Sequence, residues 1–203
     1  MIIPEGEVAC AKAEEIVRRA GVIGFRTDTF YGLGADPNNA AAVRKVADLK
    51  GREGKPILIL ISDRDLAPKY VQQTSELFAR LANRCWPGPL TLIGKATNEM
   101  PDELTAGTGT VGIRLPADDA VRALVRTCGG ALTATSANPT GKPPARTAAE
   151  VARYFPEGLD LIVDGGNVSA KEPSTVVDLS GPDLVVVREG GISRKDLDLF
   201  LQE

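Results

Sequence analysis

Apolar residues recur at helical spacing in several stretches of this chain. In residues 7–20, for example, Ala11, Ile16 and Val17 lie among charged side chains, and Gly21 follows. This spacing is typical of an amphipathic helix that ends at a glycine. By the same reasoning, helices are predicted over 7–20, from the capping residue Asn38 to Leu49, from the capping residue Thr74 to about Cys85, over 118–128, from a capping box at Thr147–Glu150, and from the capping residue Ser193 onward.

Short apolar runs lie between these helices. The run 57–61 contains five apolar residues, which is too short for an ordinary helix and typical of a strand covered on both faces. Strands are predicted in this way at 22–25, 57–61, 90–93, 111–114, 131–134, 160–164, 175–179 and 184–188. The last three follow one another without a helix between them. The pattern therefore predicts an α/β domain with a mixed parallel and antiparallel sheet.

Length and composition limit the class of protein. A chain of 203 residues with 43% hydrophobic residues can bury a full core, and we expect a single domain over 1–203. The formal net charge of −3 gives no overall field that attracts nucleic acid or anionic lipid, although a local basic cleft is compatible with it. Neither a signal-peptide pattern nor an apolar run of roughly 18–20 residues is present, so we expect a cytoplasmic protein.

The residue types that are missing restrict the chemistry. The chain contains no histidine, which is the commonest general base, metal ligand and partner of a serine or cysteine nucleophile. Cys10, Cys85 and Cys128 lie far apart without Cys-x-x-Cys spacing, which argues against a zinc site and a disulfide framework. Any reaction must therefore use positioned charge, carboxylates, or a metal held by oxygen ligands and substrate.

Polar residues follow or interrupt several predicted strands. Thr27–Gly34 comes directly after the first predicted strand, where α/β sheets bind ligands, and offers hydroxyls, a carboxylate and glycines. The same segment also suits a simple connection in which Asp28 and Thr29 bond their own backbone. Arg114 and Arg188 lie within or at the end of apolar runs, and a buried guanidinium needs an anion. That anion is either a core carboxylate or a substrate.

Two clusters combine cations with small polar side chains. The segment Lys50–Arg52 places an ammonium and a guanidinium two residues apart, which suits neighbouring phosphates. At a helix C-terminus the same residues would also complement the helix dipole as a solvated cap. The segment Ser136–Asn138 offers donors for phosphate or carboxylate oxygens, or else forms a turn into Pro139. Together the two clusters predict a polyphosphate site.

Six blocks of sequence carry a more specific signal. They are Thr27-x-Thr29-x-Tyr31-Gly32-Leu33, Lys50-x-Arg52, Val111-Gly112-Ile113-Arg114, Ser136-x-Asn138, Ser174-Thr175-Val176-Val177-Asp178 and Arg188-x-Gly190-x-Ile192. In content and order they resemble the YrdC-like family of threonylcarbamoyl-AMP synthases, and the resemblance covers nearly the whole chain. The lysine-x-arginine and serine-x-asparagine pairs are the signature of that family. Among its members, the chain resembles the short, single-domain form.

The resemblance implies a fold and a reaction. The fold is a three-layer α/β arrangement whose twisted mixed sheet forms a concave basic cleft. The reaction converts L-threonine, bicarbonate and ATP into threonylcarbamoyl-AMP and pyrophosphate, and a partner transferase complex then modifies an adenosine of tRNA. Mg²⁺ would be held mainly by the ATP phosphates, without protein ligands, and direct binding of tRNA or double-stranded RNA is left open.

The resemblance also assigns site residues by their position in the blocks. Those for L-threonine are Thr29, Arg114, Ala134 and Ser174. Those for ATP are Lys50, Arg52, Thr110, Ser136, Asn138 and Arg188, of which Lys50 and Arg52 carry the catalytic charge. Pro144 stands where relatives often have a serine that contacts ATP, so contacts within 141–146 are not carried over.

Two other functions suit parts of the sequence. A non-catalytic factor that binds double-stranded RNA or assists ribosome maturation could use the same basic cleft to follow a phosphate backbone. The acidic net charge and the aromatic content of 4% weaken that alternative. A carbamoyl-transferring domain of hydrogenase-maturation proteins shares the two signature pairs, but such proteins carry accessory domains that this chain lacks.

Overall fold

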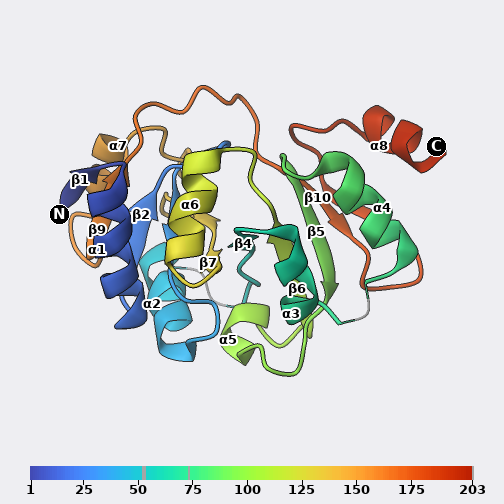
Figure 1. Cartoon of the computed structure of the whole chain (residues 1–203), viewed down its shortest axis with the longest axis horizontal. Helices are drawn as coiled ribbons and strands as arrows, with labels where there is room; N and C mark the ends of the chain where they lie inside the picture. Colours follow the sequence, from blue (N-terminus) through green and yellow to red (C-terminus); the bar gives the residue numbers. More distant parts are fainter. Residues whose placement is uncertain (52–53, 73, 203) are drawn as a thin grey trace.

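The strands form two sheets that lie side by side in the molecule (Figure 1). The computed structural model describes residues 1–51, 54–72 and 74–202. In these residues, one sheet has the strand order β1 (Ile2–Pro4), β9 (Leu161–Asp164), β2 (Ile23–Phe25), β3 (Gly32–Gly34) and β8 (Thr135–Ser136). The other has the order β11 (Val185–Arg188), β10 (Thr175–Asp178), β5 (Leu90–Lys95), β6 (Thr110–Arg114), β4 (Ile59–Ile61) and β7 (Ala131–Thr133).

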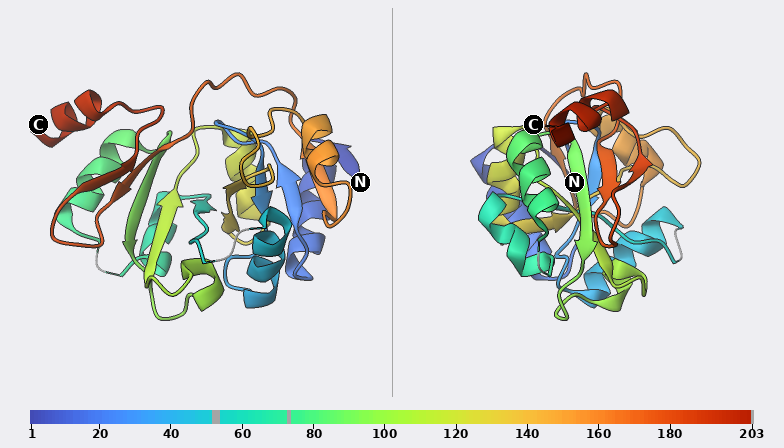
Figure 2. Two further views of the ribbon diagram at one scale, coloured as in Figure 1. Left: turned by 180° about the vertical axis from the view of Figure 1, so that it is seen from behind. Right: turned by 90° about the vertical axis from the view of Figure 1, so that its right-hand side faces the viewer.

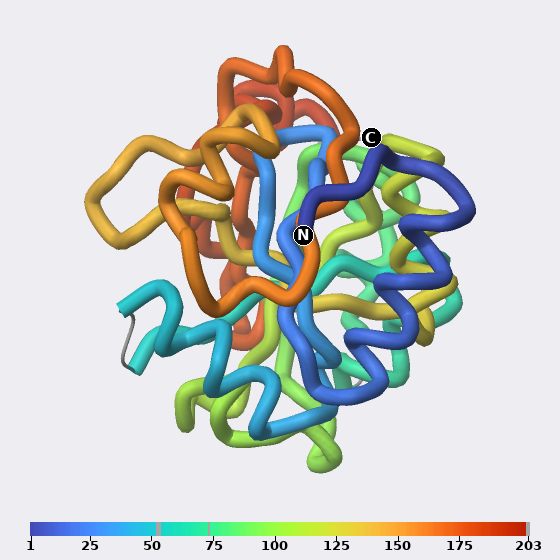
Figure 3. The backbone as a smooth tube through the Cα atoms, turned by 90° about the vertical axis from the view of Figure 1, so that its left-hand side faces the viewer, coloured from blue at the N-terminus to red at the C-terminus, as the bar shows by residue number. Residues whose placement is uncertain are grey.

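Both sheets contain parallel and antiparallel pairs, which confirms the predicted mixed α/β fold. In the first sheet β9 runs parallel to β1 and β2, whereas β3 is antiparallel to β2 and β8. In the second sheet β5 is parallel to β10 and antiparallel to β6, and β4 is parallel to β6 and antiparallel to β7. Figure 3 shows the first strand beside β9, so two segments about 160 residues apart in the sequence pair in one sheet.

The strand predicted at 131–134 passes from one sheet to the other. Residues up to Thr133 pair with β4 as β7, whereas Thr135 and Ser136 pair with β3 as β8. Ala134 stands between the two pairings, and its amide donates to the carbonyl of Leu58. The strand region is therefore divided into two sheets rather than one, and the segment around Ala134 connects them.

Helices cover both sides of the strands (Figure 2, right view). The side that lies on the left in this view carries α1 (Glu7–Arg18), α3 (Ala67–Tyr70), α4 (Glu76–Cys85) and α6 (Asp119–Thr127). The opposite side carries α2 (Ala40–Lys50) and α7 (Ala148–Tyr154), while α5 (Asp102–Thr105) contacts α2 and β6, and α8 (Arg194–Gln202) ends the chain. A short 3-10 turn at Arg64–Leu66 precedes α3. None of the helices in the described ranges is long and apolar enough to cross a membrane.

Two predicted helix caps are wrong by one residue. The side chain of Asn39, not Asn38, accepts the amide of Ala42 and begins α2, while Asn38 bonds to Asp36. Likewise α4 begins at Ser75, whose hydroxyl accepts the amide of Phe78, and not at Thr74. In both cases two residues with good capping side chains are adjacent, and only the one with extended backbone directly before the helix reaches the free amides.

The core follows the two sheets. One apolar cluster lies under α1 and α6, with Ala13, Val17, Val121 and Leu124 packed against strand residues such as Phe25. A larger cluster fills the rest of the molecule around both sheets. The segment 165–174 crosses over the top of the molecule from β9 to β10 and so joins the two halves (Figure 1).

Candidate active site

A cavity of about 560 Å³ lies where the two sheets meet. Its walls come from the loop before β3, from β4, β5 and β6, and from the segments 134–136, 173–176 and 187–188. Most of the residues that the sequence assigned to substrates line it, namely Thr29, Arg114, Ala134, Ser136, Ser174 and Arg188. Residues far apart in the sequence are thus brought to one cavity, as expected of a binding site at the ends of strands.

Other predicted residues take different places. Lys50, Thr110 and Asn138 do not line this cavity. Thr110 begins β6, and its hydroxyl lies 2.9 Å from that of Thr108. Arg52 lies outside the described residues. The assignment of these residues to ATP stays a prediction.

Arg114 has the anion that its burial requires. The residue is 5% exposed, and its guanidinium donates to Asp28 at 2.7 Å and, more weakly, to the hydroxyl of Thr29 at 3.4 Å. Asp28 follows β2 in the first sheet, whereas Arg114 ends β6 in the second. The anion is therefore a protein carboxylate, and Arg114 faces the cavity from this ion pair.

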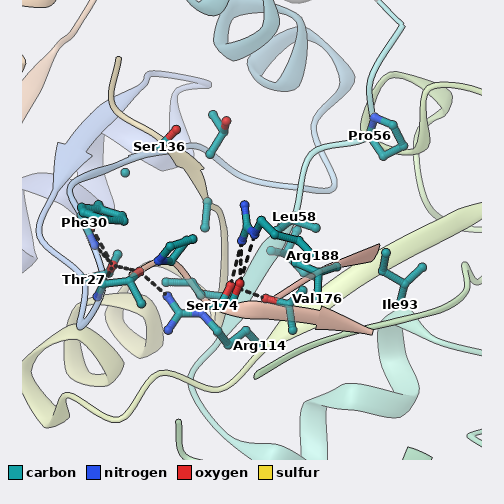
Figure 4. Close-up of a pocket in the computed structure, with 18 of the residues that line it drawn as sticks. Thr27, Phe30, Pro56, Leu58, Ile93, Arg114, Ser136, Ser174, Val176 and Arg188 are labelled. Carbon is teal, nitrogen blue, oxygen red and sulfur yellow. Dashed lines mark hydrogen bonds between the residues drawn. The ribbon is translucent and has the colours of Figure 1, made fainter. Parts of the chain in front are cut away.

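A chain of polar groups around Ser174 and Arg188 lines another part of the cavity (Figure 4). Arg188 donates to the carbonyl oxygen of Ser174 at 2.8 and 3.1 Å and to its hydroxyl at 3.2 Å. The Ser174 hydroxyl lies 2.9 Å from that of Thr91, which is 1% exposed. Arg188 thus orients Ser174, and the hydroxyl pair is held in the cavity wall with little freedom to rotate.

Lys50 is not a solvated helix cap. It is 5% exposed, and its ammonium donates to the carbonyl oxygens of Ser136 and Asn138 at 2.6 Å each and to the Asn138 side-chain oxygen at 3.2 Å. α2 ends there because Gly51 adopts a left-handed conformation with φ of 56°. The Thr140 hydroxyl donates to the Lys50 carbonyl at 2.9 Å, so the loop wraps around the lysine.

The two signature pairs meet through these contacts. The Asn138 amide group donates to the carbonyl oxygens of Pro139 and Lys142, at 3.1 and 2.6 Å, and this shapes the loop. Ser136 itself is exposed and lines the cavity. The lysine and the asparagine therefore hold the loop that presents Ser136.

Thr27 organises the loop after β2. Its hydroxyl accepts the amides of Thr29 and Phe30 at 3.1 and 3.2 Å and donates to the Phe30 carbonyl at 2.6 Å. The guanidinium of Arg146 lies 5.3 Å from the centre of the Phe30 ring, which also lines the cavity. The loop is therefore a rigid turn, and Asp28 and Thr29 do not merely bond their own backbone.

Tyr31 connects this loop to the crossing segment. Its ring is fully buried, and its hydroxyl contacts the Asp164 carboxylate at 3.2 Å, the Gly166 carbonyl at 2.9 Å and the Gly165 amide at 3.2 Å. Burial, together with the nearby charge of Asp164, raises the pKa of Tyr31 to about 12. The phenol therefore stays protonated at neutral pH and fixes the start of the segment 165–174.

Sequence reasoning missed Thr91 as a site residue. It lies inside an apolar run, but β5 alternates, so Leu90 and Leu92 enter the core while Thr91 and Ile93 face the cavity. The available signal was the Thr91 hydroxyl itself, since a polar side chain inside an apolar run indicates a strand face that is not packed in the core. Asp28 was noticed only as a loop residue, because nothing local in the sequence links it to Arg114.

Within the described residues, no group of three or more histidine, cysteine, aspartate or glutamate side chains could hold a metal ion. The carboxylate of Asp28, the partner of the cavity-lining Arg114, is engaged by Arg114 and by the Ala117 amide.

Comparison with known proteins gives consistent matches. The family model of Sua5, YciO and YrdC proteins, described as telomere recombination, matches residues 15–190. A threonylcarbamoyl-AMP synthase of Thiobacillus denitrificans is 43% identical over 166 residues, which are 81% of this chain and 87% of that protein. One from Pyrococcus abyssi is 33% identical over 94% of this chain and 56% of its own length.

Solved structures agree in fold. The crystal structure of Pyrococcus abyssi Sua5 complexed with L-threonine has a TM-score of 0.95 at 32% identity, and the match covers all of this chain and 61% of that one. YciO of Escherichia coli has a TM-score of 0.84 at 29% identity, with 94% and 95% covered. A HypF structure matches at only 15% identity, which shows the shared fold alone.

Proposed function

Because the chain belongs to the Sua5/YciO/YrdC family, we propose that it is an L-threonylcarbamoyladenylate synthase. In this reaction L-threonine, bicarbonate and ATP give threonylcarbamoyl-AMP and pyrophosphate. The observation that carries the proposal is the buried guanidinium of Arg114, which faces the same cavity as the hydroxyls of Thr29 and Ser174. L-Threonine offers a carboxylate for the guanidinium and a hydroxyl for the neighbouring polar groups.

The threonine end is proposed from these contacts. Arg114 would bind the substrate carboxylate with its planar fork, and Thr29 and Ser174 would accept or donate hydrogen bonds to the remaining polar groups. The backbone of Ala134, which lines the cavity between the two sheets, would assist. The relative from Pyrococcus abyssi, whose structure is described as complexed with L-threonine, supports L-threonine as the substrate.

The ATP end is proposed from Ser136, Arg188 and the residues around them. Ser136 and Arg188 line the cavity, and Lys50 and Asn138 hold the loop that carries Ser136. Arg52 and Thr110 complete the set by their positions in the sequence. Mg²⁺ bound mainly by the phosphates would neutralise charge on the triphosphate.

The chemistry needs positioning more than a protein nucleophile. The threonine nitrogen and bicarbonate form a carbamate with loss of water, and a carbamate oxygen attacks the α-phosphorus of ATP while pyrophosphate leaves. The protein must hold the reacting groups in line and neutralise the departing charge. A chain without histidine can do both.

The product is a reactive mixed anhydride that a second protein must use. We place this step in the cytoplasm, ahead of a transferase complex that modifies tRNA. The alternative of a non-catalytic RNA-binding factor is not favoured, since the similar proteins are named as synthases.

The proposal is tested by measuring pyrophosphate release from ATP with L-threonine or bicarbonate left out in turn. Both should be required, because the carbamate forms only when both are present. Undiminished release without either one would contradict the proposed reaction. L-Serine should react poorly but detectably, since one methyl group in an apolar pocket is worth about 1–3 kcal/mol.

A further inference from the structure

Two ion pairs cross between the end of β2 and the segment after β6. Arg26 pairs with Asp118 at 2.7 Å, and Asp28 pairs with Arg114 at 2.7 Å. Each segment therefore contributes one cation and one anion, and we call these four residues the crossed clasp. It joins the first sheet to the second beside the cavity, since β2 and β6 belong to different sheets.

The two pairs of the clasp differ in what they touch. Arg26 also binds Glu5 at 3.2 Å, away from the cavity lining, and Asp118 caps α6 by accepting the amides of Ala120 and Val121. These contacts secure the fold. Arg114, in contrast, lines the cavity, so only the Asp28 pair reaches the substrate site.

Asp28 is held firmly enough to fix a guanidinium. One of its carboxylate oxygens accepts from Arg114, and the other accepts the amide of Ala117 at 3.1 Å. Its own backbone belongs to the turn that the Thr27 hydroxyl organises. Both oxygens and the backbone are therefore constrained, and the Arg114 fork has one preferred orientation.

Charge alone does not require this arrangement. The Asp28 carboxylate already neutralises part of the positive charge of Arg114. It therefore weakens the attraction between Arg114 and the carboxylate of an incoming substrate. The benefit of Asp28 therefore lies in orientation. An Arg114 guanidinium that is free to rotate would still attract the substrate carboxylate. It would not, however, place the amino nitrogen of the substrate in line with the other reactants.

We propose that Asp28 is a positioning residue: it orients Arg114 so that the bound amino acid presents its nitrogen for carbamate formation. The inference rests on the proposed function. It predicts a loss in kcat rather than in substrate affinity when Asp28 is changed. No comparable effect is expected from the other pair of the clasp.

The test compares Asp28→Asn with the matched control Asp118→Asn. Asparagine is as good a helix cap as aspartate, so the control removes a clasp carboxylate while α6 stays capped. For Asp28→Asn, kcat should fall roughly 10- to 100-fold, the scale of a misplaced reacting group. The Kd for L-threonine, measured by calorimetry, should rise by no more than about threefold, because the Arg114 charge remains and is no longer partly neutralised by Asp28. For Asp118→Asn, kcat should stay within about threefold of the wild-type value.

Three outcomes would overturn the inference. They are an unchanged kcat in Asp28→Asn, a loss confined to threonine affinity, and an equal kcat loss in both variants. If Asp28→Asn does not fold, as judged by thermal unfolding, Asp28→Glu carries the same test, since it keeps the charge but displaces the carboxylate. If the wild-type protein itself needs no threonine for pyrophosphate release, the proposed function fails, and this result is distinct from any difference between variants.

Discussion

Arg114 and Lys50 are both 5% exposed, yet their surroundings differ in kind. Arg114 ends a strand, is paired with a carboxylate, and faces the cavity. Lys50 ends a helix, donates to two backbone carbonyl oxygens, and does not line the cavity. One region presents a cation to the cavity, and the other uses a cation to build a loop.

The difference shows that burial of a cation does not by itself identify a ligand site. The carbonyl oxygens of Ser136 and Asn138 accept from the Lys50 ammonium, so the lysine holds the backbone of the loop that carries Ser136. Asp28 cancels much of the charge of Arg114 but fixes its direction. The threonine end of the proposed site would thus depend on the orientation of Arg114, and the ATP end on a correctly folded loop around Ser136.

The largest effect is expected for Arg114→Ala. Removing one partner of a buried charge pair typically costs 2–5 kcal/mol, so kcat/KM for L-threonine should fall roughly 10²- to 10³-fold. The variant should also lose about 3 kcal/mol of unfolding free energy, since Asp28 is left unpaired. Steady-state kinetics and urea unfolding measure the two effects.

A matched control for this change is Arg126→Ala. Arg126 also pairs with an aspartate, Asp63, at 2.8 Å, but its side chain is 55% exposed. An exposed pair contributes at most about 1 kcal/mol, and activity should be kept. If kcat/KM for L-threonine were the same in the two variants, Arg114 would not bind the substrate, and its contrast with Lys50 would not hold.

The second largest effect is expected for Lys50→Ala. Loss of hydrogen bonds to a charged group should lower the unfolding free energy by about 2 kcal/mol. If the lysine charge also stabilises the departing pyrophosphate, turnover should fall roughly 10²-fold. Denaturant unfolding and turnover at saturating ATP separate the two contributions.

Lys45→Ala is the control in the same helix. Lys45 also donates to a carbonyl oxygen, that of Ala20, at 2.7 Å, but on the surface. Its replacement should change the unfolding free energy by at most about 0.5 kcal/mol and leave turnover intact. A Lys50→Ala variant that loses stability and keeps full turnover would reduce the lysine to a purely structural role.

Most of the fold was predictable from local patterns, and the failures have local causes. Amphipathic spacing located α1, α4 and α6, whose apolar sides face the core. β3 was missed because its sequence is Gly-Leu-Gly, which has no strand propensity. It pairs because the Phe25 ring packs on Gly34, where a Cβ atom would lie 2.7 Å from the ring. That contact is tertiary and cannot be read from the strand itself.

The candidate site shows the same limit. The sequence showed that Arg114 needs an anion, because a guanidinium interrupts an apolar run. It could not name Asp28, which is 86 residues away and becomes a neighbour only when the two sheets meet. Similarly, the sequence at Lys50 is compatible both with a solvated helix cap and with a buried lysine that binds a loop. The position of the loop 136–142 decides between the two.

A smaller effect is expected in hydrogen exchange, where the segment 165–173 is compared with the strand that ends at Arg114. The crossing segment 165–173 is attached through Val168, whose amide donates to Arg146, and ends at Ser174 in the cavity wall. We expect it to close over the site, because a mixed anhydride must be kept from water. ATP plus L-threonine should slow hydrogen exchange in 165–173 about tenfold or more, while exchange in the strand 110–114 stays unchanged. Unchanged exchange in the segment would argue against closure.

The smallest effect concerns the anchor of that segment, Tyr31→Phe. At neutral pH the variant should be less stable by about 1 kcal/mol, since the Tyr31 hydroxyl bonds to Gly166 and Gly165 are lost. The folded state raises the pKa of Tyr31 from 10 to about 12, so the unfolded chain releases the phenol proton first as the pH rises. The stability due to Tyr31 is therefore complete below pH 10 and declines between about pH 10 and 12. Urea unfolding at several pH values should show the gap between wild type and variant narrowing above pH 10, and a gap that widens there would contradict the protonated anchor.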